Sequence, residues 1–93
     1  MNLSVEISLY PLHVEYKDRI KDFLEKLNAS ASNSVDKSVE IRSNNMSTRL
    51  FGEFDAVHQL LTECMRYSMQ KYGKQVFVCK FIEGDTRELS GYD

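Results

Sequence analysis

The segment from Asn2 to Tyr10 alternates strictly between apolar and polar side chains, and this pattern constrains the fold more than any other part of the chain. Its two sides are Leu3, Val5, Ile7 and Leu9, and Ser4, Glu6, Ser8 and Tyr10. A period of two predicts a strand with one buried face. Pro11, which has no backbone N–H, is expected to end the strand.

Two longer segments have the apolar spacing of amphipathic helices. Residues 15–28 carry one apolar stripe, and residues 55–72 carry a second. The second stripe consists of Val57, Leu60, Leu61, Cys64, Tyr67 and Ser68. We expect Asp55 or Glu53 to cap the start of this helix and Gly73 to follow its end.

Three further segments, 38–43, 46–51 and 75–82, have the composition of strands. The small polar residues of 28–34 predict a loop, because their side chains compete for backbone hydrogen bonds. Asn44-Asn45 predicts a tight turn, so the two middle strands should form a hairpin.

The order strand, helix, strand, strand, helix, strand predicts an α+β fold. We expect a ferredoxin-like βαββαβ sandwich: a four-stranded antiparallel sheet in the order 4-1-3-2, with two helices on one face. A chain of 93 residues is suited to a single domain over 1–93. Its core should span about 2–83, and the polar tail over 84–93 should be loosely held.

Composition narrows the function classes. The net charge is −2 and no basic run occurs, which disfavours nucleic-acid binding. No apolar stretch approaches the ~20 residues of a membrane span, and the N-terminus lacks the basic start of a signal peptide. We therefore expect a cytoplasmic protein without membrane insertion. A homodimer is also expected, because small domains commonly bury more surface by association.

Cys64 and Cys79 lie fifteen residues apart, without the closer spacing or the histidines of a metal site. Both are expected to be small buried hydrophobic residues, and no metal or cofactor is expected. His13 and His58 have no nucleophile or acid arranged beside them in the sequence, so no catalytic activity is expected. An enzyme would have to use one of these two histidines.

The sheet face without helices should carry the function, because it must meet water, a ligand or another protein. The first strand presents Glu6, Ser8 and Tyr10 there. The third strand adds Ser47, Arg49 and Phe51 if Thr48 and Leu50 point at the helices, although Met46 could instead mark the inward set. The last strand adds either Phe77, Cys79 and Phe81 or Val76, Val78 and Lys80. Either set leaves an exposed apolar patch, which is typical of an interface or a ligand groove.

Glu6 stands in the middle of the first strand, where a carboxylate needs solvent or a hydrogen-bond donor. Three interpretations remain open: a solvated side chain, a cross-strand pair with Arg49, or a contact to a ligand.

Three segments resemble motifs of the YkoF-like thiamin/hydroxymethylpyrimidine-binding domains. They are Ser8-Leu9-Tyr10-Pro11-Leu12, Met46-Ser47-Thr48-Arg49-Leu50-Phe51-Gly52-Glu53 and Phe77-Val78-Cys79-Lys80-Phe81. Spacing and element order agree over roughly 4–82. Members of that family carry two such domains in tandem whereas this chain has one, and a homodimer could stand in for the tandem. The resemblance implies non-catalytic binding of thiamin or its hydroxymethylpyrimidine moiety, in uptake or salvage of the vitamin.

Under this resemblance, a flat aminopyrimidine would stack on Tyr10, Phe51 or Phe77. Its polar edge would meet hydrogen-bonding groups of Glu6, Ser8, Ser47 and Thr48. Arg49 would pair with Glu6 or contact a phosphate of a phosphorylated ligand. The alternative function is an oligomerisation or interaction module without a small-molecule ligand, built on the apolar face or on the edge of the last strand.

Overall fold

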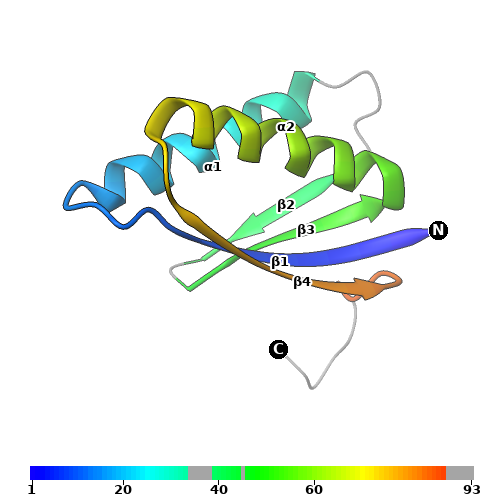
Figure 1. Cartoon of the computed structure of the whole chain (residues 1–93). Coiled ribbons are helices and arrows are strands. Elements are labelled where there is room, and N and C mark those ends of the chain that lie inside the picture. Colours follow the sequence, from blue (N-terminus) through cyan, green and yellow to red (C-terminus); the bar gives the residue numbers. More distant parts are fainter. Residues whose placement is uncertain (34–38, 45, 88–93) are drawn as a thin grey trace.

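The computed structural model describes residues 1–33, 39–44 and 46–87. It contains the elements β1 (Asn2–Tyr10), α1 (Tyr16–Asn33), β2 (Glu40–Ser43), β3 (Thr48–Glu53), α2 (Phe54–Tyr72) and β4 (Val76–Glu83). The strands form one antiparallel sheet in the order β2-β3-β1-β4, with both helices on one face (Figure 1). Read from the other edge this is 4-1-3-2, so the predicted fold is confirmed.

Some predictions fall on residues outside the described part of the chain: the last residue of the predicted loop, Ser34, the first residue of the predicted second strand, Ser38, the turn residue Asn45 and the tail residues 88–93. No helix in the described ranges is both long and apolar enough to cross a membrane.

The core lies between the sheet and the helices, and β1 forms its centre. The alternating residues Leu3, Val5, Ile7 and Leu9 are all buried toward the helices, as the period of two predicts. They meet apolar side chains from α1, β3 and α2, namely Phe23, Leu27, Leu50, Val57, Leu60, Leu61 and Cys64. Helix α2 buries the predicted stripe except for Tyr67, and α1 buries Phe23 and Leu27.

The register of β3 settles which of its side chains face the helices. Thr48 lies opposite Ile7 and Leu50 opposite Val5, so both point into the core. Arg49 and Phe51 consequently belong to the other face. Met46 is 86% exposed and does not mark an inward set, so the first of the two registers weighed from the sequence is correct.

The register of β4 decides between the two sets left open for the last strand. Cys79 lies opposite Ile7 and Phe77 opposite Leu9, so the odd-numbered residues of β4 face the helices. The ring of Phe77 packs against that of Phe23, with centroids 5.2 Å apart. Phe77 is therefore not on the uncovered face, contrary to its inclusion among the predicted ligand contacts.

Helix α1 is longer than predicted, because residues 28–33 continue the helix instead of forming a loop. Alanine is the best helix former, and this segment contains two, Ala29 and Ala31, of which Ala31 also packs on the core. The Asn28 side-chain amide donates to the Leu24 carbonyl (2.8 Å), so it stays within helical geometry rather than breaking the helix.

The ends of α2 follow the capping signals in the sequence. A Glu53 carboxylate oxygen accepts hydrogen bonds from the backbone N–H groups of Asp55 (2.8 Å) and Ala56 (3.0 Å), so Glu53 is the cap rather than Asp55. Gly73 has a φ of 81° and its N–H donates to the Met69 carbonyl (2.8 Å). It occupies the left-handed region that favours glycine after a helix.

The sheet face without helices is partly covered by the chain itself. The Ser4 hydroxyl donates to the Gly84 carbonyl (2.8 Å) and accepts from the Thr86 N–H (3.1 Å). The predicted loosely held tail is thus bonded to β1 over its first residues, 84–87. As a result Ser4, on the uncovered face, is only 3% exposed.

Phe51, on the same face, is buried beneath three arginines. The guanidinium groups of Arg42, Arg49 and Arg87 lie 5.6, 5.9 and 5.6 Å from the ring centroid. Such cation–ring contacts are favourable and shield the ring from water. With 1% of Phe51 exposed, its ring offers no open face for stacking on a ligand in this structure.

Phe51→Ala should lower the free energy of unfolding by about 3 kcal/mol, as for a buried aromatic residue in a core, although no helix covers it. Val76→Ala, on the same face but 44% exposed, should change it by less than about 1 kcal/mol. Urea unfolding of both variants measures the difference. Equal small losses would show that Phe51 is solvated.

A polar cluster joins the outer surfaces of the two helices. The Asp22 carboxylate accepts hydrogen bonds from the hydroxyls of Tyr67 (3.1 Å) and Tyr72 (3.0 Å) and from the Lys71 ammonium (3.2 Å). Burial raises the pKa of Asp22, but the hydrogen bonds from Lys71, Tyr72 and Tyr67 outweigh it and lower the pKa below its usual value of 3.8.

A lowered folded-state pKa stabilises the fold at neutral pH, and this contribution is lost as the pH falls below about 4. Asp22→Asn should therefore be less stable than the parent at pH 7, and the difference should shrink toward pH 2. Thermal unfolding measured across this range, with the exposed Asp18→Asn as control, tests the sign. A difference in stability between Asp22→Asn and the parent that stays constant with pH would contradict the lowered pKa of Asp22.

Candidate functional site

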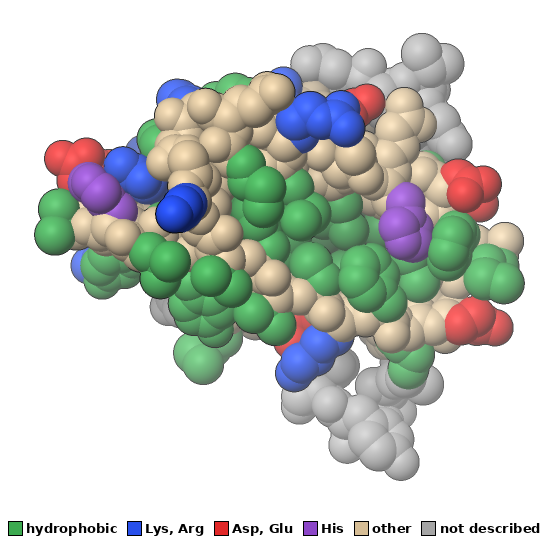
Figure 2. Space-filling view, viewed as in Figure 1, with side chains coloured by type: hydrophobic (Ala, Val, Ile, Leu, Met, Phe, Trp, Pro, Cys, Tyr) green, Lys and Arg blue, Asp and Glu red, His purple; other side chains and the backbone are tan. Residues whose placement is uncertain are grey.

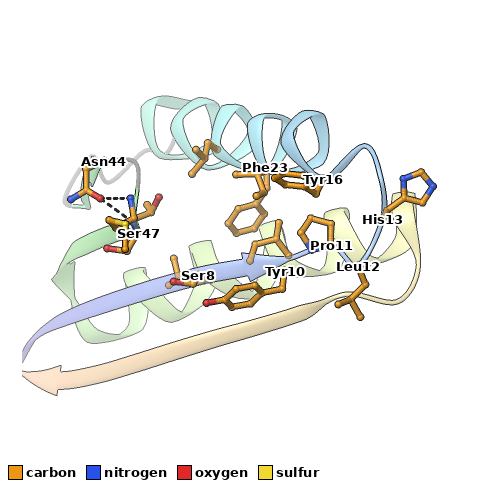
Figure 3. Close-up of a pocket in the computed structure, with 15 residues that line it drawn as sticks. Ser8, Tyr10, Pro11, Leu12, His13, Tyr16, Phe23, Asn44 and Ser47 are labelled. Atoms are coloured by element: carbon orange, nitrogen blue, oxygen red, sulfur yellow. Dashed lines mark hydrogen bonds between the residues drawn. The ribbon is translucent and has the colours of Figure 1, made fainter.

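The central strand β1 is paired unequally along its two edges. It pairs with β4 from Leu3 to Tyr10, but with β3 only from Asn2 to Ile7. At Ser8–Tyr10 none of the described strands lies beside it on the β3 side. A cavity of about 480 Å³ occupies this gap at the end of the sandwich (Figure 3).

The cavity is lined by residues 7–13, by α1 and by the turn between β2 and β3. The end of β1 and the loop after it form one wall, α1 forms another, and the turn between β2 and β3 closes a third side. Its apolar residues include Ile7, Leu9, Pro11, Tyr16, Ile20, Phe23 and Leu24. Figure 3 shows the rings of Phe23, Tyr16 and Pro11 close together on the helix side. The volume and the apolar lining are typical of a small-molecule site.

The backbone of Leu9 supplies polar groups at this cavity. In a strand, successive residues direct their N–H and C=O groups to opposite edges. The Asn2 carbonyl accepts from Gly84 on the β4 side, and the Met1 carbonyl accepts from Phe54 on the β3 side. By this alternation the N–H and C=O of Leu9 face the β3 side. No strand in the described ranges pairs with them there, so one donor and one acceptor stand side by side at the cavity wall.

The turn opposite Leu9 is held by its own hydrogen bonds. The Asn44 side-chain oxygen accepts from the N–H groups of Met46 (2.7 Å) and Ser47 (3.0 Å), and the Asn44 N–H donates to the Ser47 carbonyl (3.0 Å) (Figure 3). This arrangement is an Asx turn. It fixes Ser47 and Thr48 at the cavity wall.

Glu6 is connected to the cavity through Ser47. The Ser47 hydroxyl donates to Glu6 Oε2 (3.2 Å), and the Lys80 ammonium lies 3.6 Å from Glu6 Oε1. Arg49 stands directly opposite Glu6 in the register. Glu6 therefore forms an ion pair with Lys80, whereas the partner weighed from the sequence was Arg49. The carboxylate acts on the cavity by orienting the Ser47 hydroxyl.

The mouth of the cavity carries three exposed apolar side chains, namely Tyr10, Leu12 and Met46. Leu12 has a φ of 58°, a left-handed conformation that disfavours a residue with a Cβ by about 1–2 kcal/mol. Backbone strain of this kind is concentrated at binding and catalytic loops. The loop after β1 is thus held in a specific, strained shape beside the cavity.

The two histidines lie in different surroundings. His13 lines the cavity, and its Nδ1 accepts a hydrogen bond from the Glu15 N–H (3.0 Å). His58 lies between the rings of Phe54 and Phe81, with centroids 4.4 and 5.5 Å away. Within the described residues, no three His, Cys, Asp or Glu side chains are grouped so that they could hold a metal ion.

Both cysteines are free thiols. Cys64 is fully buried as predicted, whereas Cys79 on β4 is only partly buried. Burial raises the pKa of both thiols, which lowers their fraction of reactive thiolate at neutral pH.

The structure brings together part of the predicted site. Ser8, Tyr10, Ser47 and Thr48 line the cavity, and Glu6 is one hydrogen bond away. Arg49 and Phe51 belong instead to the arginine-covered part of the uncovered face. Phe77 lies behind the cavity-lining ring of Phe23.

Sequence reasoning missed the apolar walls on α1 and the backbone of Leu9. One signal was available, because the first predicted strand, 2–10, is longer than the neighbouring strand predicted over 46–51. A central strand longer than its neighbour must leave backbone groups unpaired at one end.

Comparison with known proteins supports the fold. No family model and no curated protein matches the chain. Among solved structures, protein SP2199 from Streptococcus pneumoniae is 21% identical, with a TM-score of 0.71 over 97% of this chain and 92% of that one. A Thermotoga maritima protein described as a candidate thiamine biosynthesis/salvage protein is 17% identical, with a TM-score of 0.74 over 90% and 85%. A domain of unknown function from Bacillus cereus is 13% identical, with a TM-score of 0.70 over 92% and 79%. At these identities, the likeness establishes that the chain shares their fold.

Proposed function

We propose that the chain binds a small aminopyrimidine without chemical turnover, and that the ligand is thiamin or its hydroxymethylpyrimidine moiety. The observation that carries the proposal is that, among the described residues, no strand pairs with the N–H and C=O of Leu9 at the wall of an apolar cavity. One of the structural neighbours is described as a candidate thiamine biosynthesis/salvage protein, and this description is consistent with a thiamin-related ligand.

An aminopyrimidine matches these two groups through one edge. Its ring nitrogen accepts a hydrogen bond, and the adjacent amino group donates one, so the ligand can satisfy the Leu9 N–H and C=O together. Groups of this kind are strongly disfavoured if they stay unpaired once water is excluded. Recognition by such a pair therefore selects for a flat molecule with a donor and an acceptor on neighbouring atoms.

The remaining contacts follow from the walls. The ring would lie against the apolar side chains of α1, chiefly Ile20 and Phe23. The hydroxymethyl group, or the link to the thiazolium, would face the Ser47 hydroxyl that Glu6 orients. The thiazolium ring of bound thiamin would extend into the mouth of the cavity beside the exposed ring of Tyr10, because the attraction between a cation and an aromatic ring favours that position.

Hydroxymethylpyrimidine and thiamin should both raise the melting temperature, because a ligand bound only by the native state stabilises it by mass action. The matched control is a pyrimidine with the same substituents but without the amino group. It should give a much smaller shift, since the Leu9 carbonyl would then lose its donor. No shift with millimolar thiamin or hydroxymethylpyrimidine would contradict the proposal.

Two further measurements locate the site. In an amide NMR titration with hydroxymethylpyrimidine, the Leu9 N–H should move among the most, as a new acceptor reaches it. Glu6→Gln should weaken binding about threefold to tenfold by loosening Ser47, whereas Glu15→Gln, on the surface before α1, should not change it. Shifts confined to residues outside the cavity would place the site elsewhere.

A further inference from the structure

The outer edge of β4 is long and largely exposed. β4 has eight residues, while the strand at the opposite edge, β2, has four and carries Glu40 and Arg42. Charged and short edge strands resist pairing, whereas long apolar ones favour it. Within the described residues no strand pairs with the outer side of β4.

Apolar side chains cover both faces of this edge. Val76, Val78 and Ile82 on the helix-free face and Phe81 on the helix face are each between 44% and 56% exposed. Figure 2 shows apolar side chains gathered along β4 and between β4 and α2. The ring of Phe81 stacks on His58 at an interplanar angle of 6°, and this presents a flat surface beside the edge.

The backbone groups that face outward can be assigned from the pairing with β1. The even-numbered residues of β1 direct their N–H and C=O groups toward β4, because Asn2 bonds to Gly84 on that side. Their partners on β4 are Val76, Val78, Lys80 and Ile82. Phe77, Cys79 and Phe81 therefore direct their backbone groups outward.

We propose that two copies of this chain pair β4 to β4 in antiparallel fashion, with Cys79 at the two-fold axis, into one continuous eight-stranded sheet. Two copies related by a two-fold axis present the same edge to each other, so each outward N–H meets an outward C=O. The pairing also covers the exposed apolar residues, with Val76 beside the partner's Ile82 and Phe77 beside the partner's Phe81.

Charge selects this register over its neighbour. Only two symmetric registers overlap nearly the whole strand, one centred on Cys79 and the other on Lys80. Centring on Lys80 would place that ammonium directly opposite its own copy, and directly opposed like charges destabilise a sheet. Centring on Cys79 places Lys80 opposite the partner's Val78, with no like charges in direct opposition. This inference does not rest on the proposed ligand.

The register is tested by placing either charge at Val78, which is 46% exposed and lies opposite the partner's Lys80 in this arrangement. Val78→Lys should raise the dimer dissociation constant about tenfold, because two repulsive pairs form per dimer. Val78→Glu should leave it unchanged or lower it. Sedimentation equilibrium of the full chain and both variants measures this.

The same two substitutions should affect the stability of the monomer in the opposite order to their effect on the dimer. Measuring both quantities therefore distinguishes an effect on folding from an effect on association. Glu6 lies diagonally across from Val78 on the same sheet face, so Val78→Lys should be the more stable monomer. Weakening of the dimer by both variants alike, or a chain that stays monomeric at several hundred micromolar, would overturn the proposal.

Mild oxidation gives an independent measure of the register. Directly opposed residues in a hydrogen-bonded pair have Cα atoms ~5.5 Å apart, which a disulfide can span. Peptide mapping of the oxidised dimer should therefore find Cys79 joined to Cys79. Cys79→Ser should remove the link and keep the dimer. A dimer cross-linked only through other positions, or held by a different co-purifying chain, would overturn it.

Discussion

The backbone hydrogen-bonding groups along the two edges of β1 determine most of this structure. One neighbour, β4, satisfies β1 over Leu3–Tyr10, and the other, β3, stops opposite Ile7. Because buried backbone groups need partners, the place where β3 stops also becomes the place where a ligand can bind. The same requirement applies to the outer edge of β4, with which no strand of the described residues pairs.

The fold could be predicted because local signals agree with the tertiary arrangement. The alternation in β1 marks the face that lies against Phe23 and Leu27, and Gly73 ends α2 where its conformational freedom is needed. The missed part was the last turn and a half of α1. There Ser and Asn residues predict a loop by composition, but helix propensity and the packing of Ala31 outweigh them.

The candidate site was predictable only in part, because its geometry depends on where strands end relative to one another. Sequence alternation places Ser8 and Tyr10 on one face, but it cannot show that β3 stops before reaching them. Alternation also assigns Phe51 to the face away from the helices. It cannot show that arginines from β2, β3 and the segment after β4 bury this ring. Side-chain identity predicts a role only once the neighbouring backbone is known.

The contacts of residues 84–87 also set how far the folding unit extends. Arg87 covers the ring of Phe51 and lies 3.6 Å from Glu40 on the opposite edge strand, while Thr86 bonds to Ser4. A chain shortened to the end of β4 would keep every described helix and strand, yet it would lose one of the three guanidinium groups over the Phe51 ring and leave the Ser4 hydroxyl without these two partners. Such a chain would therefore be less stable, although its secondary structure would be complete.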